Sequence, residues 1–429
     1  MFPLFFSTDV LAVGFRLTPL QLAALSKPPS TGRTHGSDAG TDGYGRVFYL
    51  ESQHSFRHPN EYYTASEEPD GTWFNPHGLF GLGDGARIDA ADFHRLYNGF
   101  PPDGLDMTFS VDKSVSALWA IAEPDMRAGI EGLAIIAARA ALEDTVLKYA
   151  GYTRITRGGG IVPVPADLMA AVFPHGTSRE NDPQLHIHTT ILNVARTCGD
   201  GRYRAHHQHP AYGWSKAAGE LFRAYLAWDL RRSLGVRMER YGRNGAYTRI
   251  PGLPEDLLTF WSKRRKAIVA KAGELGIPVR GNASRLAGVN KLTRTAKSPG
   301  KPHDNDPEVR HRRWRGEAGG FAEREALIAA VTGNDAELHH EELRNLTEDL
   351  DVLPGYLARE EAVFRRPDMV EAAANAAAGL LGREAAGTAI ERVRRNPEIE
   401  ALELPRPRRN QMPAWSIRSA IRPAVSERQ

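Results

Sequence analysis

The stretch Phe173-Pro-His175-Gly-Thr-Ser-Arg-Glu-Asn-Asp-Pro-Gln-Leu-His186-Ile-His188 decides how this chain folds. Apolar and partly β-branched residues run from Leu168 to Phe173 and again from Leu185 to Val194. The polar segment between them, 176–184, contains Gly, Asn, Asp and Pro, which favour turns. The pattern predicts two antiparallel strands joined by a turn.

The second of these strands places two imidazoles on one face. Side chains two residues apart in a strand point the same way, so His186 and His188 lie together while Ile187 faces the core. His175, at the end of the preceding strand, can reach the same face and complete a three-histidine metal site with open positions. A His-x-His pair alone is more often an ordinary surface or core feature, and the third histidine is what favours a metal.

Helical sequence surrounds the strands. An extended segment, Asp106–Ser110, leads through a turn at Val111–Lys113 into a helix with one apolar stripe. The stripe consists of Met126, Ile130, Leu133, Ala137 and Ala140. Further helices are predicted from about Trp214 to Leu234 and from Pro251 to Gly276. Strands and helices in this order indicate an α+β domain.

Composition narrows the class of protein without naming a function. The 429 residues are 41% hydrophobic with a formal net charge of +3, and the pI near 8.9 permits a nucleic-acid partner. A single cysteine, Cys198, rules out an internal disulfide and a cysteine-rich zinc module. The apolar start, Met1–Val13, lacks a basic flank, and no apolar run approaches the roughly 18 residues of a membrane span. We expect no membrane segment and a cytoplasmic location.

The histidine motif resembles that of a known family. His175 and His186-Ile-His188, embedded in Ser178–Leu185 and followed by Ile191-Leu-Asn193, resemble the three-histidine motif of the TrwC/MobF conjugative relaxases, which are HUH endonucleases. The resemblance implies a central antiparallel sheet flanked by helices that carries the histidines. It also implies site- and strand-specific DNA nicking and rejoining by metal-assisted tyrosine transesterification, which initiates conjugative plasmid transfer.

Cofactor and partners follow from the same resemblance. A divalent metal ion is expected, and its identity among Mg, Mn, Zn and Ni stays open, because imidazoles suit Zn, Mn or Ni while Mg prefers carboxylate oxygens. The expected partners are single-stranded and hairpin DNA at a transfer origin, together with other relaxosome and conjugation proteins.

A second signature supplies a candidate base. The stretch Leu105-Asp-Met-Thr-Phe-Ser-Val-Asp-Lys-Ser-Val-Ser116 resembles the family segment whose aspartate takes the proton of the nucleophile, and this role falls on Asp106. The ordinary alternative is a carboxylate that caps a turn. Asp106 lies on a strand-like segment away from the helix start, where capping is awkward.

Tyrosines near the amino terminus are the candidate nucleophiles. Glu61-Tyr62-Tyr63-Thr64 resembles the family's second tyrosine motif, whereas the first motif is represented by Phe48-Tyr49. Phe48 has no hydroxyl, so Tyr49 is the positional candidate there, with Tyr62 and Tyr63 as the others. Two alternatives stay open: a degenerate relaxase that only binds DNA, and a three-histidine hydrolase that activates water.

Basic residues downstream are candidates for holding DNA. Trp261-Ser-Lys263-Arg264-Arg265-Lys266 lies on a predicted helix, and Lys291, Arg294 and Lys297 follow it. Trp261 is expected either to pack on a base or to lie inside the domain. A solvated basic face is the competing interpretation.

The domain boundaries follow composition and the extent of the resemblance. We predict an atypical, flexible leader at 1–45, a relaxase domain at 46–300 and a basic, polar linker at 301–345. A helical remnant of the start of a helicase half is predicted at 346–404 and a disordered tail at 405–429. The sequence contains no Gly-x-x-x-x-Gly-Lys-Ser/Thr phosphate loop, so we expect no ATP-driven motor in this chain.

Overall fold

The structure is a computed structural model that describes part of the chain. The residues described are 70–98, 104–178, 180–241, 247–278, 289, 306–332, 340–360, 363–395, 399–402 and 416–419. The predicted leader at 1–45 lies outside them.

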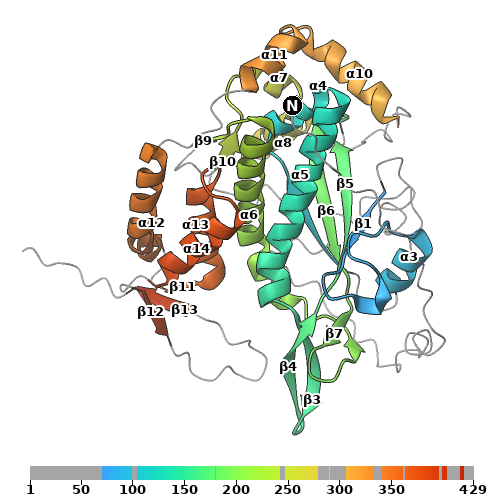
Figure 1. Cartoon of the computed structure of the whole chain (residues 1–429), viewed down its shortest axis with the longest axis vertical. Helices are drawn as coiled ribbons and strands as arrows, with labels where there is room; N and C mark the ends of the chain where they lie inside the picture. The colour runs from blue at the N-terminus through green and yellow to red at the C-terminus, as the bar shows by residue number, and fades with distance from the viewer. Residues whose placement is uncertain are drawn as a thin grey trace, which may run out of the picture.

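A four-stranded antiparallel sheet forms the centre of the molecule, with strand order β1-β5-β6-β2. Its strands are β1 (Thr72–Phe74), β5 (Ala170–Thr177), β6 (Pro183–Ile191) and β2 (Leu105–Ser110). β5 and β6 are the two strands predicted around the histidines, and helices flank the sheet (Figure 1). The predicted α+β class with a central antiparallel sheet is confirmed.

One face of this sheet packs against three helices. These are α4 (Lys113–Ile121), α5 (Pro124–Leu142) and α6 (His209–Leu234), and a π-helical turn, η2 (Glu143–Leu147), continues α5. Alternate residues of β2, Met107 and Phe109, point into this core together with Ile187 of β6. The stripe predicted on α5 is confirmed, since Ile130 is buried in the same core. Because these residues face the apolar core, the residues that alternate with them along each strand face the other side of the sheet.

The other face is covered over part of its area by a second apolar cluster. Helix α3 (Ala90–Asn98) and the short η1 (Leu79–Gly81) enclose Trp73, Phe93 and Phe173 there. Phe173 precedes His175 by two residues on β5, so both side chains share this face. The apolar cluster therefore ends where the histidines begin.

A second four-stranded sheet continues from the first. It has the order β3-β4-β7-β8 and consists of β3 (Tyr152–Arg157), β4 (Gly160–Asp167), β7 (Ala195–Thr197) and β8 (Tyr203–Arg204). The β3–β4 hairpin extends from the body of the molecule at the bottom of Figure 1. A separate pair, β9 (Glu239–Tyr241) and β10 (Tyr247–Arg249), follows α6.

Between β10 and residue 332, the described part of the chain includes four helices that differ from the predicted pattern. They are α7 (Glu255–Phe260), α8 (Lys263–Glu274), α10 (Pro307–Ala318) and α11 (Arg324–Val331). The single helix predicted over 251–276 is thus divided at Trp261 and Ser262. Helices α10 and α11 also lie within 301–345, where a linker is predicted. Of these, α10 packs the rings of His311 and Trp314 against Trp119 of α4.

The carboxy-terminal part is a small unit of its own helices and strands. It comprises α12 (His340–Glu360), α13 (Arg366–Ala377) and α14 (Arg383–Arg394), with β11 (Val363–Arg365), β12 (Ile399–Leu402) and β13 (Ser416–Ser419) in one sheet. Helix α13 packs against α6. The helical character predicted for 346–404 is present, and β13 lies within the predicted tail. None of the helices in the described part of the chain is long and apolar enough to cross a membrane.

Candidate metal centre

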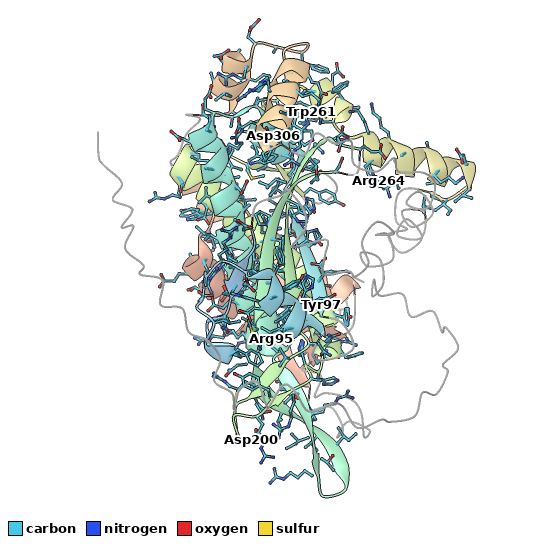
Figure 2. The ribbon with its side chains drawn as sticks, turned by 90° about the vertical axis from the view of Figure 1, so that its right-hand side faces the viewer. Arg95, Tyr97, Asp200, Trp261, Arg264 and Asp306 are labelled. Carbon is cyan, nitrogen blue, oxygen red and sulfur yellow. The ribbon has the colours of Figure 1, made fainter. Side chains whose placement is uncertain are left out.

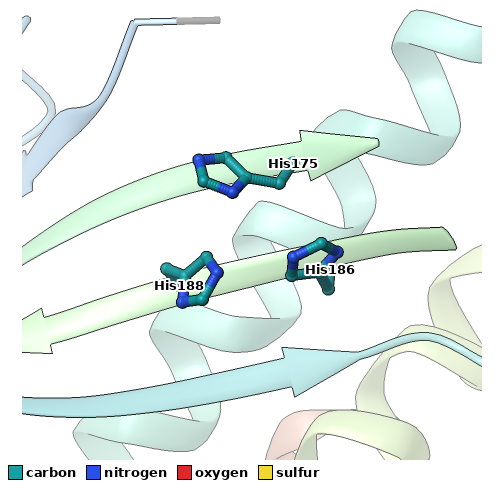
Figure 3. A group of neighbouring side chains, drawn as sticks. All are labelled: His175, His186 and His188. Atoms are coloured by element: carbon teal, nitrogen blue, oxygen red, sulfur yellow. The ribbon is translucent and has the colours of Figure 1, made fainter. Parts of the chain in front are cut away.

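The β5–β6 hairpin brings the three predicted histidines together. His175 pairs directly with His186 in the ladder, and His188 follows two residues along β6, so all three rings lie on one face (Figure 3). The three side chains are buried, with exposed fractions of 2%, 7% and 0% respectively. One nitrogen from each ring lies within 4.8 Å of the other two. The sheet register alone therefore builds a cluster of three nitrogen donors.

Hydrogen bonds from two of the rings set which nitrogen carries the lone pair. Nδ1 of His188 lies 2.8 Å from Oδ2 of Asp106, and Nδ1 of His186 lies 2.8 Å from the carbonyl oxygen of Gln184. Both partners are acceptors, so each Nδ1 donates its hydrogen and the lone pair is on Nε2. Metal-binding histidines commonly show this arrangement, with the outer ring nitrogen bonded to a carboxylate or a carbonyl.

Asp106 lies on the neighbouring strand, on the same face as the histidines. Its Oδ2 accepts from His188 and from Oγ1 of Thr108 at 3.2 Å. The other oxygen, Oδ1, is buried and has no hydrogen-bond partner among the residues described. The side chain as a whole is 15% exposed. One carboxylate oxygen thus orients His188, and the second is available to accept a proton.

The donor set fits a borderline transition-metal ion. Three imidazole nitrogens around one ion at about 2.1 Å lie about 3.4 Å apart in a tetrahedral site, and the nitrogens of this cluster lie within 4.8 Å of one another. Three protein ligands leave a position for a substrate oxygen, as in catalytic zinc sites. The residues that could hold the metal are therefore His175, His186 and His188. Asp106 orients the ring of His188 through the hydrogen bond to its Nδ1.

The basic residues at the start of α8 differ in their surroundings. Arg265 and Lys266 are exposed, whereas Nζ of Lys263 lies 2.9 Å from Oδ1 of the buried Asp182. Helix α8 extends outward from the body, with Arg264 near its start (Figure 2). Lys291, Arg294 and Lys297 lie outside the described residues.

Trp261 belongs to the core, which corrects its predicted contact with DNA. Its side chain is fully buried, and Nε1 donates to Oε2 of Glu317 at 2.7 Å. The indole belongs to the same hydrophobic core as Leu257 of α7 and Trp314 of α10. Of the two roles weighed for Trp261, only packing inside the domain agrees with this placement.

The tyrosine candidates Tyr49, Tyr62 and Tyr63 lie outside the described residues, so their positions relative to Asp106 stay predictions. Two other residues that contact the site or its hairpin were not anticipated from the sequence. Thr108 lies two residues after Asp106 on β2, and the strand period alone indicates that it shares the face of the histidines. Asp182, in the turn between β5 and β6, carries no comparable signal.

Comparison with known families gives one match to a family model. The model of the TrwC relaxase family matches residues 44–321, which is more than half of the 429-residue chain. The matched range includes the three histidines and Asp106.

Individual relatives agree with that match. The multifunctional conjugation protein TraI of Escherichia coli is 28% identical over 313 residues, which are 70% of this chain and 16% of TraI. TraI of Escherichia coli strain K12 gives the same figures. The chain therefore spans about a sixth of the length of these curated relatives.

Solved structures of TrwC share the fold. The metal-free conjugative relaxase TrwC in complex with oriT DNA is 23% identical, with a TM-score of 0.52, over 65% of this chain and 95% of that one. TrwC complexed with a 27-mer DNA that comprises the recognition hairpin and the cleavage site is 23% identical with a TM-score of 0.50, at the same coverage. At such identities the likeness concerns the fold.

Proposed function

The chain belongs to the TrwC relaxase family, and from that premise we propose that it nicks and rejoins one DNA strand at a transfer origin. The observation that carries the proposal is the alignment of His175, His186 and His188 on one sheet face, with Asp106 bonded to His188. The resulting reaction would be a reversible phosphodiester transesterification that initiates conjugative transfer. The partners proposed are single-stranded and hairpin DNA, with other relaxosome and conjugation proteins.

The residues of the site divide the work of this reaction. A divalent cation on the three imidazoles would polarise the scissile phosphate through a non-bridging oxygen. The imidazoles of His186 and His188 are held by Gln184 and Asp106, so their nitrogens are oriented before substrate arrives. Which ion is bound stays open; a set of three neutral nitrogens favours Zn, Mn or Ni over Mg.

Asp106 is the proposed base. A phenol has a pKa of about 10 and is a poor nucleophile near neutral pH, so it needs a group that takes its proton. Oδ1 of Asp106 is the acceptor, since Oδ2 is engaged by His188 and Thr108. A tyrosine oxygen, from Tyr49, Tyr62 or Tyr63, then bonds phosphorus as the bond to the 3′ oxygen breaks. The products are a 5′-phosphotyrosine and a 3′-hydroxyl, whose proton comes from the solvent or from Asp106.

The DNA strand would be held by the cations beyond the metal centre. Arg265 and Lys266 project from α8 into solvent, where they can neutralise backbone phosphates. We assign the same role to Lys263 and Arg264 at the start of α8 and to Lys291, Arg294 and Lys297. Base stacking by Trp261 is not part of the proposal, because its indole is buried.

A covalent-adduct assay tests the proposal. The protein is mixed with a single-stranded oligonucleotide that carries its origin and with Mn²⁺, denatured, and mapped by mass spectrometry. We expect a tyrosine adduct that is lost in one of Tyr49→Phe, Tyr62→Phe or Tyr63→Phe and in His188→Ala. DNA binding with no adduct would replace the proposal by a DNA-binding function alone. Cleavage with a free 5′-phosphate and no adduct would indicate a hydrolase that activates water.

A further inference from the structure

The turn that joins the two histidine-bearing strands is partly buried and contacts several helices. Within it, the main chain of Ser178 donates to the carbonyl of Asp182 at 2.9 Å, and Asn181 adopts a positive φ of 57°. Oγ of Ser178 accepts from the main-chain nitrogen of Asp182 at 3.2 Å. Asp182 itself is 1% exposed. A carboxylate so deeply buried is costly unless partners satisfy it.

The partner of Asp182 is the first residue of α8. Oδ2 accepts from the main-chain nitrogen of Lys263 at 2.8 Å, and Oδ1 lies 2.9 Å from Nζ of the same lysine. The preceding residue, Ser262, makes no side-chain capping bond to the helix. Asp182 thus caps α8 from another part of the chain and adds a favourable charge at its amino end.

Helix α8 is mostly exposed in the described part of the chain. Of its twelve residues only Ala272 is buried, and Figure 2 shows the helix extending from the body at the end that carries Arg264. A mostly exposed helix depends strongly on the contacts at its ends for its direction, so the bonds at Lys263 contribute to fixing α8.

Two other elements hold the same turn in place. The carbonyl of Asn181 accepts from Nη2 of Arg313 at 2.8 Å and from Nε1 of Trp314 at 3.1 Å, both on α10. Nζ of Lys113, at the start of α4, donates to the carbonyl of Pro183 at 2.8 Å. Helices α10 and α4 therefore both hold the turn in place. Through Asp182, the turn in turn holds the start of α8.

We propose that Asp182 is a positioning residue that fixes the basic helix α8 relative to the three histidines, so that its cations hold the DNA strand whose phosphate occupies the metal centre. The inference rests on the proposed function. Asp182 precedes His186 by four residues, which is about 13 Å along a strand. A DNA strand at about 3.4 Å per nucleotide covers that distance in about four nucleotides. The start of α8, at Lys263, therefore lies within a few nucleotides of the scissile phosphate.

The first test measures α8 itself, without DNA. Spin labels are placed at Glu274→Cys on α8 and at the exposed Ala128→Cys on α5, in a Cys198→Ser background, and their distance distribution is recorded. We expect one narrow distribution, broadened in Asp182→Asn and unchanged in the control Asp167→Asn. Asp167 pairs with Arg196 beyond the opposite end of β5. Lys263→Met, which removes the ion pair from the exposed side, is the second variant should Asp182→Asn fail to fold.

The second test asks whether that position matters for DNA. We expect Asp182→Asn and the pair Arg265→Ala/Lys266→Ala each to lower affinity for a single-stranded oligonucleotide about tenfold, and the combination to lower it by much less than the product. Affinity for Mn²⁺ alone should not change. A distance distribution that stays narrow in both Asp182→Asn and Lys263→Met, or independent effects on DNA affinity, would overturn the inference. If the wild-type chain binds no DNA, the proposed function fails instead.

Discussion

The β5–β6 hairpin and helix α8 carry the two halves of the proposed site in opposite ways. His175, His186 and His188 are buried within paired strands, and the hydrogen-bond ladder fixes their spacing. The cations of α8 extend into solvent from a helix that is anchored through Lys263 at one end. The proposed chemistry therefore lies on paired strands, and the proposed DNA-binding helix is joined to them through the buried carboxylate of Asp182.

This difference has a physical consequence for mutation. Sites on paired strands are held to within a fraction of an ångström by their neighbours, whereas an exposed helix keeps its direction only through its contacts. Changes in the hairpin should therefore act on metal binding first. Changes on α8 should leave metal binding intact and act on DNA.

The largest effect is expected from the metal ligands. Replacing His186 or His188 by Ala removes one of three donors, and we expect Mn²⁺ affinity to fall by more than the 10- to 100-fold typical of an outer hydrogen-bond partner. Calorimetric titration measures it, with the exposed His209→Ala on α6 as control. Unchanged Mn²⁺ affinity in both ligand variants would mean that these histidines do not bind the metal.

Asp106→Asn should come next. The amide keeps the shape of the side chain but loses the charge that faces His188, so we expect metal affinity to fall about 10- to 100-fold. Adduct formation should fall further, by another factor of about 10² to 10⁴, because the general base is lost as well. Thr108→Val, which removes only the hydroxyl bonded to Asp106, is the graded control. Equal losses in binding and in adduct formation would argue against a role for Asp106 as base.

The sequence predicts the parts of this site that lie within the hairpin, and it does not predict the contacts between distant elements. The strand period of two placed His186 and His188 on one face, and the ladder confirms that His175 joins them. The bond between Asp106 and His188 joins strands 82 residues apart, so no local pattern gives it. Only the resemblance to a family put both residues in one site.

Where the sequence pattern was weak, it left alternatives open or missed an element, for identifiable reasons. Trp261 stands next to a run of cations, and its neighbours gave no sign that the indole would bond Glu317, 56 residues away. The polar composition of 301–345 concealed α10, because few of its residues are apolar and the helix is held by the rings of His311 and Trp314 on Trp119. Contacts distant in sequence decide both cases.

A smaller effect is expected from the exposed cations of α8. Arg265→Ala/Lys266→Ala should lower affinity for single-stranded DNA about tenfold and reduce the slope of log affinity against log salt by about 0.7 for each phosphate that is no longer neutralised. Metal affinity should stay the same. Lys216→Ala/Arg232→Ala is the matched control, since these exposed residues lie on α6 behind the sheet. If the α6 pair lowered affinity as much, the effect would be one of total charge and not of α8.

The smallest effect concerns pH and helix α10, which holds the turn between the two regions. Burial lowers the pKa of His311 to about 4, against an ordinary value of 6.5, and its Nδ1 donates to the carbonyl of Ala120 at 3.0 Å. Between pH 4 and 6.5 the unfolded chain binds more protons at this residue than the folded chain does, so stability is constant above about pH 6.5 and falls below it. We expect a loss of about 1 kcal/mol from this group between pH 7.5 and 5.5. Urea unfolding of metal-free protein at the two pH values measures it, and His311→Gln should show a smaller loss.

Arg313 and Trp314 on the same helix donate to Asn181, so the spin-label distance between α8 and α5 should broaden at pH 5.5 in wild type more than in His311→Gln. Equal broadening in the two proteins would mean that acid acts on α8 by a route other than α10.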